Sequence, residues 1–124
     1  MELVNQPTAI TCGQSCIAML TAKTVEQVIA ELNWDKGMPP DKLLEGLDHY
    51  GIRRGEGFVR ISRRNPLPDG VAILHVETNY NFSHWVLLYH GKYYDPKFGI
   101  FAKEYPHGKA VAYLQVWPLE DGEG

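Results

Sequence analysis

The spacing of apolar residues divides this chain into a helical first half and a β-type second half. The clearest helix lies between Thr24 and Asn33, where apolar side chains recur at helical spacing, at Val25, Val28, Ile29 and Leu32. Thr24 and Gln27 form a capping-box pattern at the start of this helix. End signals predict two further helices, one from Thr11 to about Lys23 and one from Pro40 to about Tyr50.

From Gly51 onward, short runs rich in β-branched and aromatic residues predict strands, at residues 57–62, 71–77, 84–89, 92–95 and 111–117. Helices followed by strands indicate an α+β fold, with the helices packed on an antiparallel sheet. A chain of 124 residues is long enough for one packed core. We therefore expect a single domain over residues 1–124, with a helical half at about 11–50 and a β half at about 51–118.

Charge and hydropathy exclude two classes of partner. The 12 Lys and Arg residues and 15 Asp and Glu residues give a formal charge of −3. The basic residues are scattered, so no continuous cationic face for a nucleic acid is evident. No apolar run approaches the ~20 residues that span a bilayer, and residues 1–5 do not resemble a signal peptide. We expect a cytosolic protein without a membrane segment; the oligomeric state is left open.

The two cysteines, Cys12 and Cys16, lie four residues apart. On a helix they would share one face without the geometry of a disulfide, which favours thiol chemistry or burial in a reducing compartment. A zinc site made from both cysteines and a histidine matches the spacing of structural zinc sites poorly. We expect no metal and no other cofactor.

Cys12 is the candidate nucleophile, because its position in the predicted helix favours an anionic sulfur. If Thr11 is the N-cap, Cys12 occupies the first helical position, where unpaired N–H groups and the helix dipole stabilise a thiolate. Thr11 and Gln14 would form a second capping box, and Gly13 would leave room for an approaching substrate carbonyl. The alternative is a buried structural thiol, which is our interpretation of Cys16.

His84 is the candidate base and Asp95 the residue that orients it, because a predicted hairpin brings them together. The strand at 84–89 turns at His90-Gly91 and returns at 92–95. The resulting register pairs Tyr89 with Lys92, Leu87 with Tyr94 and His84 with Lys97. His84 and Asp95 are then diagonal neighbours on one face, ~7–8 Å apart by Cα. A one-residue bulge would separate them, and a histidine in a strand can also be purely structural.

Gln6 is the candidate oxyanion donor. It lies six residues before Cys12, and Pro7 holds the preceding backbone extended, so the amide could donate N–H groups beside the sulfur. Aromatic residues are common in strands, but three of them flank His84 and are expected, with Gly13, to contact substrate, namely Tyr80, Phe82 and Trp85. Together these residues supply every role in a thiol acyl-transfer site.

Two segments carry a resemblance to a known family. Gln6-x5-Cys12-Gly13 at a helix start, followed by His84-Trp85-Val86-Leu87-Leu88 and Tyr94-Asp95-Pro96, resembles the C39 peptidases, which are papain-like bacteriocin-processing proteases. The resemblance extends from Gln6 to Gly99, and we expect a stand-alone domain. It implies a papain-like α+β fold, with Cys12 as nucleophile, His84 as base, Asp95 as orienter and Gln6 as oxyanion donor. That family cleaves leader peptides after a Gly-Gly pair.

The expected function is hydrolysis of a peptide or isopeptide bond in a peptide or protein substrate. Two alternatives stay open. A deamidase, a transglutaminase-like enzyme or an acyltransferase effector would use the same three groups, because all pass through a thioester. A binding module could keep the fold without the chemistry, although it would need none of the four candidate residues.

Overall fold

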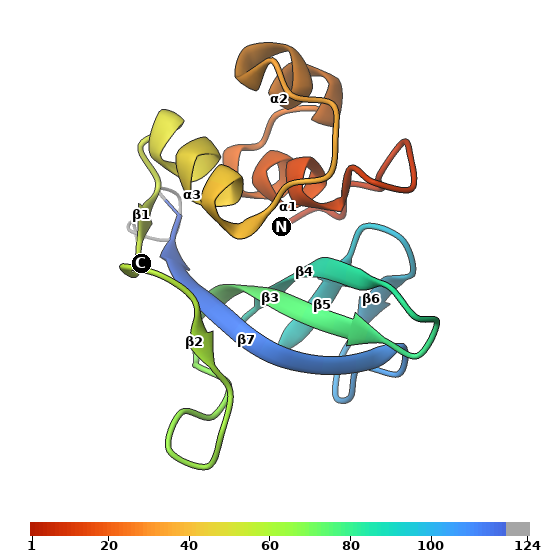
Figure 1. Cartoon of the computed structure of the whole chain (residues 1–124), viewed down its shortest axis with the longest axis vertical. Helices are drawn as coiled ribbons and strands as arrows, with labels where there is room; N and C mark the ends of the chain where they lie inside the picture. The colour runs from red at the N-terminus through yellow and green to blue at the C-terminus, as the bar shows by residue number, and fades with distance from the viewer. Residues whose placement is uncertain (119–124) are drawn as a thin grey trace.

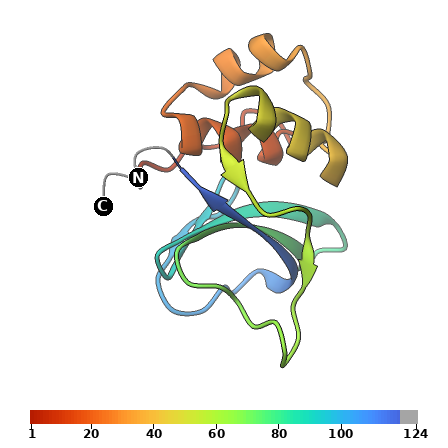
Figure 2. The ribbon, with the colours of Figure 1, turned by 90° about the vertical axis from the view of Figure 1, so that its left-hand side faces the viewer.

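The computed structural model describes residues 1–118; residues 119–124, the end of the expected domain, lie outside the described part. Three helices come first, α1 (Cys12–Thr21), α2 (Val25–Leu32) and α3 (Pro40–His49). Seven strands follow, β1 (Arg53–Arg54), β2 (Val59–Arg60), β3 (Val71–Thr78), β4 (Ser83–Tyr89), β5 (Lys92–Asp95), β6 (Gly99–Phe101) and β7 (Gly108–Trp117). The helices form one layer and the strands another (Figures 1 and 2), which confirms the predicted α+β class.

The strands form one antiparallel sheet in the order β1-β7-β3-β4-β5-β6, with β2 also paired to β7. The long β3 and β7 lie side by side at its centre. All five predicted strands are present, although the run at 57–62 pairs only over Val59–Arg60. The sequence did not predict β1 and β6, since two or three residues are too few to show a period.

The helix ends confirm one predicted cap and contradict another. At α2, the Thr24 hydroxyl accepts from the Gln27 backbone and the Gln27 side chain accepts from the Thr24 backbone, as predicted. At α1, the predicted capping box is wrong. Thr11 accepts from the Thr8 N–H, and the buried Gln14 amide donates to the carbonyls of Trp34 and Lys36. Gln14 therefore ties α1 to the connection between α2 and α3.

The main core lies between the two layers. Its largest fully buried side chains come from both, namely Ile17, Leu43, Leu47, Ile73, Leu87 and Leu114. A second apolar cluster lies on the other face of the sheet, built by Ala72, Leu74, Val76, Val86 and Leu88. α1 packs on β4, and the backbone of Trp85, near the start of β4, contacts Cys12, the first residue of α1, at the boundary between the layers. The candidate catalytic residues lie at this junction.

Candidate active site

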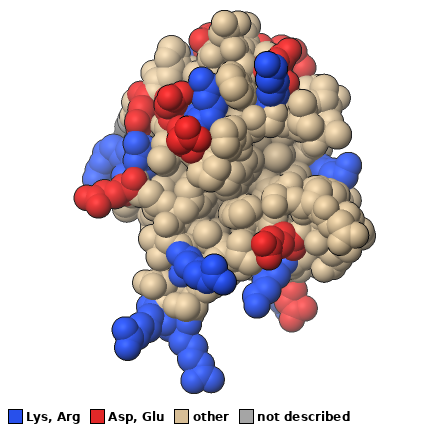
Figure 3. Space-filling view, viewed as in Figure 1, with Lys and Arg blue, Asp and Glu red and all other residues tan. Residues whose placement is uncertain are grey.

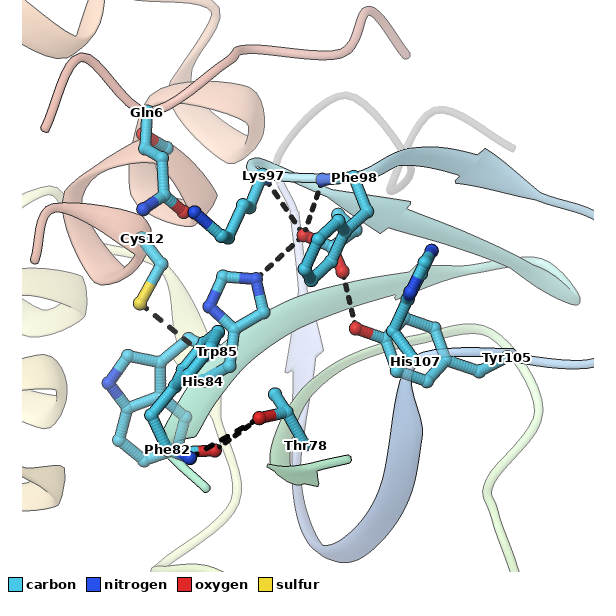
Figure 4. Close-up of polar contacts among 12 residues, drawn as sticks. Gln6, Cys12, Thr78, Phe82, His84, Trp85, Lys97, Phe98, Tyr105 and His107 are labelled. Carbon is cyan, nitrogen blue, oxygen red and sulfur yellow. Dashed lines mark hydrogen bonds and ion pairs between the residues drawn. The ribbon is translucent and has the colours of Figure 1, made fainter. Parts of the chain in front are cut away.

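Cys12 is the first residue of α1 and is held against the start of β4. Its side chain is buried, with 8% of the residue exposed. The backbone N–H of Trp85 donates to Cys12 Sγ at 3.5 Å (Figure 4). The Trp85 indole N–H donates to the carbonyl of Met38 at 2.8 Å, which anchors this strand end to the helical layer. The sulfur therefore receives a neutral backbone donor in addition to its place at the helix N-terminus.

The hairpin brings His84 to Asp95. The predicted register is present, with Leu87 opposite Tyr94 and Tyr89 opposite Lys92. The turn residues, His90 and Gly91, both have positive φ, as a two-residue hairpin turn requires. The predicted pairing of His84 with Lys97 is wrong, because the ladder between β4 and β5 ends at Leu87 and Tyr94. The next residue, Asp95, pairs with Gly99 of β6. His84 Nε2 and Asp95 Oδ1 nevertheless lie 2.6 Å apart, both buried.

Asp95 is fully buried, and both of its carboxylate oxygens accept hydrogen bonds. Besides His84, its Oδ1 accepts from the backbone N–H groups of Lys97 at 2.8 Å and Phe98 at 3.1 Å. Its Oδ2 accepts from the Tyr105 hydroxyl at 2.5 Å. Burial alone would raise the pKa of Asp95, but the hydrogen bonds from His84 and Tyr105 outweigh burial and lower it. Asp95 is therefore an anion at neutral pH.

Tyr105 is a site residue that the sequence did not predict. It lies in the connection between β6 and β7, ten residues after Asp95. Its hydroxyl donates to Asp95 Oδ2, the carboxylate oxygen that His84 does not contact. Burial raises the pKa of Tyr105, and the neighbouring Asp95 carboxylate raises it further, so the hydroxyl stays a donor. No local sequence signal marks it, because the contact depends on how β6 and β7 fold back onto β5.

His84 is poised to carry a positive charge. Burial lowers the pKa of its imidazole, but the hydrogen bond with Asp95 and the adjacent Cys12, together with the charges on both groups, raise it to about 9. Since Nε2 faces Asp95, the other ring nitrogen, Nδ1, is the one that points toward the Cys12 sulfur (Figure 4). The arrangement favours an imidazolium next to the Cys12 sulfur.

Gln6 lies on the N-terminal arm, with its side chain pointing toward Cys12 (Figure 4). Its backbone N–H donates to the carbonyl of Pro96 at 2.9 Å, which fastens the arm next to Asp95. Its amide nitrogen donates to the Thr8 carbonyl at 2.9 Å, while its amide oxygen is buried without a partner. One N–H of the amide is thus engaged locally, and the second remains for another acceptor.

A cleft of about 570 Å³ opens beside Cys12 and His84. Its walls are largely apolar, with Ile10, Met38, Pro39, Phe82 and Trp85 among them. Figure 3 shows a hollow along the boundary between the helical layer and the sheet, where charged side chains are sparse. Two of the residues predicted to contact substrate, Phe82 and Trp85, therefore line the cleft.

The other two predicted substrate contacts lie elsewhere. Tyr80 is exposed and its hydroxyl pairs with His107 Nδ1 at 2.8 Å, and it is not among the residues that line the cleft. Gly13 is buried against Met38, where an added Cβ would lie 2.9 Å from the sulfur of that residue. A side chain at this position would crowd Met38, so the glycine also serves packing in the helical layer. His75 lines the cleft beside Trp85.

A scan against protein-family models found no match to this chain, and a search of curated proteins found no similar sequence. Among residues 1–118, no group of three or more His, Cys, Asp or Glu side chains is arranged to hold a metal ion. None of the helices described for this chain combines the length and apolar character needed to cross a membrane.

We predict that iodoacetamide alkylates Cys12 much faster than Cys16 at neutral pH. Cys12 borders the cleft beside an imidazolium, whereas Cys16 is fully buried and burial raises the pKa of its thiol well above the usual value. Peptide mapping by mass spectrometry of the folded protein would give both rates, with the Cys12→Ala variant as a control for labelling at Cys16. Equal rates would contradict the assignment of Cys12.

We also predict that Asp95→Asn lowers the pKa of His84. In the wild type, His84 is protonated through neutral pH and loses its proton only as the pH rises through about 9. Removing the carboxylate charge takes away a main cause of the raised value, so the variant should titrate at lower pH. NMR of the imidazole would measure this, with Asp69→Asn as a control of equal charge change in an exposed loop. An unchanged His84 titration would exclude Asp95 as its partner.

Proposed function

We propose that this protein is a thiol hydrolase that cleaves a peptide or isopeptide bond, with Cys12 as nucleophile, His84 as acid and base, and Asp95 as orienter. The observation that carries the proposal is the buried 2.6 Å contact between His84 and Asp95 next to a cysteine at a helix N-terminus. A structural histidine needs neither a buried carboxylate held by three further donors on one side nor a thiol on the other. The adjoining cleft gives a substrate access to the sulfur.

The first half of the reaction forms a thioester. The Cys12 thiolate attacks the substrate carbonyl carbon, forming a C–S bond and moving an electron pair onto the carbonyl oxygen. When this intermediate collapses, the C–N bond breaks and His84 donates its Nδ1 proton to the departing nitrogen. Asp95 keeps the ring oriented through Nε2 throughout.

The second half is hydrolysis. Water attacks the thioester carbon and gives a proton to the neutral His84 imidazole, and collapse releases the carboxylic acid and restores the Cys12 thiolate. In both halves, negative charge develops on the substrate oxygen. The backbone N–H of Cys12, which has no partner within the helix, and the second N–H of Gln6 are the donors proposed for that charge.

The resemblance to C39 peptidases supports the same roles. Gln6, Cys12, His84 and Asp95 occur in the order of that family, and the α+β architecture with helices before strands agrees with a papain-like fold. We therefore propose the papain-like fold and C39-like chemistry together. A fold alone does not imply an activity, so the proposed activity depends on these four side chains.

Cleavage of a peptide library in H₂¹⁸O, followed by mass spectrometry, tests the proposal. We expect discrete cleavage products that carry ¹⁸O at the new carboxylate, and their loss in Cys12→Ala and in His84→Ala. Products without ¹⁸O, joined instead to an added amine, would show acyl transfer rather than hydrolysis. Cleavage that persists in a folded Cys12→Ala variant would overturn the proposed nucleophile.

Replacing Gln6 by Ala should lower kcat by ~10²–10³ if its amide stabilises the oxyanion. Cys12 should still react with iodoacetamide, because that alkylation develops no oxyanion. The exposed neighbour Asn5 offers a matched control, Asn5→Ala, on the same arm. A Gln6→Ala protein with lower melting temperature but wild-type kcat would give Gln6 a structural role only.

A further inference from the structure

Basic side chains line the cleft beside Cys12, and no carboxylate is among its described lining residues. Of the described residues that line it, the ionisable ones besides Cys12 are His75, His84 and Lys97, and none is Asp or Glu. Asp95 lies behind His84 and is fully buried, so its charge is already engaged. A substrate that brings a negative charge into this cleft meets opposite charge, whereas the described lining offers no carboxylate to a positive one.

Of the basic residues in the cleft, Lys97 has its backbone held by a hydrogen bond to Asp95. Its backbone N–H donates to Asp95 Oδ1 at 2.8 Å, so the residue is tied to the orienter of the proposed base. Its side chain extends toward Gln6 and Cys12 (Figure 4), with the ammonium 6.0 Å from the ring centroid of Phe82 and 5.6 Å from that of Phe98. Contacts over these two rings favour that orientation.

The Lys97 charge is not neutralised by the protein. Within residues 1–118, the ion pairs involve other groups, and none joins Lys97 to a carboxylate. Lys97 lines the cleft and is exposed, so a ligand in the cleft can reach its ammonium. The Lys97 ammonium therefore has no carboxylate partner among the described residues, and a carboxylate of a ligand can take that place.

We propose that Lys97 binds a carboxylate of the substrate close to the scissile bond, so that the substrates are peptides with an acidic group there and an apolar side chain in the cleft. This inference rests on the proposed thiol hydrolase function. Two sources share the chemistry, an acidic side chain and a free C-terminal carboxylate. Lys97 is a specificity residue in this scheme, since it contacts the substrate without taking part in bond breaking.

Charge selectivity can be measured at Cys12 without knowing the substrate. Iodoacetate and iodoacetamide differ by one negative charge, so the ratio of their rate constants reports the local charge, while changes in intrinsic thiol reactivity cancel. We expect Lys97→Gln to lower this ratio about three- to tenfold at low salt, and added salt to narrow the difference. Lys92→Gln, at the other end of β5, removes the same charge and should retain the wild-type ratio.

Three alkylating dipeptides separate the two sources of the carboxylate. Chloroacetyl-Leu-Gln-NH₂ is neutral, chloroacetyl-Leu-Glu-NH₂ adds a side-chain carboxylate, and chloroacetyl-Leu-Gln-OH adds a terminal one. The charged probe that alkylates Cys12 faster than the neutral probe identifies the source, and Lys97→Gln should remove its advantage.

The outcomes also separate this inference from the function on which it rests. If Cys12 reacts rapidly with iodoacetamide but Lys97→Gln leaves the iodoacetate ratio at the wild-type value, the role of Lys97 is overturned and the hydrolase stands. The role of Lys97 is likewise overturned if neither charged dipeptide is faster than the neutral one. If Cys12 in the folded wild type reacts no faster than Cys16, the proposed function fails and the substrate inference fails with it.

Discussion

The hydrogen bond between His84 Nε2 and Asp95 Oδ1 is the interaction on which the candidate site depends. A buried carboxylate is costly unless donors satisfy its oxygens, and here two backbone N–H groups and the Tyr105 hydroxyl complete that task. Because Nε2 is committed to Asp95, only Nδ1 is left to face Cys12. The same contact raises the pKa of His84, which couples the orientation of the ring to its charge.

The fold makes this contact possible through two constraints. A two-residue turn at His90 and Gly91 fixes the register of β4 against β5, and a slip of one residue would turn His84 or Asp95 to the opposite face. The packing of α1 on β4 supplies the sulfur, held by the N–H of Trp85. A thiol from the helical layer and an imidazole with its carboxylate from the sheet therefore meet at a junction that neither layer could build alone.

Local patterns predicted most of the fold and part of the site. The helix at 25–32 and the hairpin register follow from short-range rules, and both are present. What the sequence did not predict arises from contacts between distant segments. The Gln14 side chain does not form the expected cap, because its amide donates to two carbonyls that follow α2. The Tyr105 hydroxyl contacts Asp95 only because β6 and β7 fold back onto β5. The basic lining of the cleft also escaped prediction, since it combines residues from several elements.

Cys12 and His84 should act as one coupled pair if the proposed chemistry is right. The most direct test of this coupling is an NMR titration of the His84 imidazole before and after Cys12 is blocked as a methyl disulfide with methyl methanethiosulfonate. Since Cys12 is one of the groups that raise the pKa of His84 to about 9 in the free protein, blocking its sulfur should lower that value. A His84 titration that is identical in the free and blocked proteins would contradict the coupling.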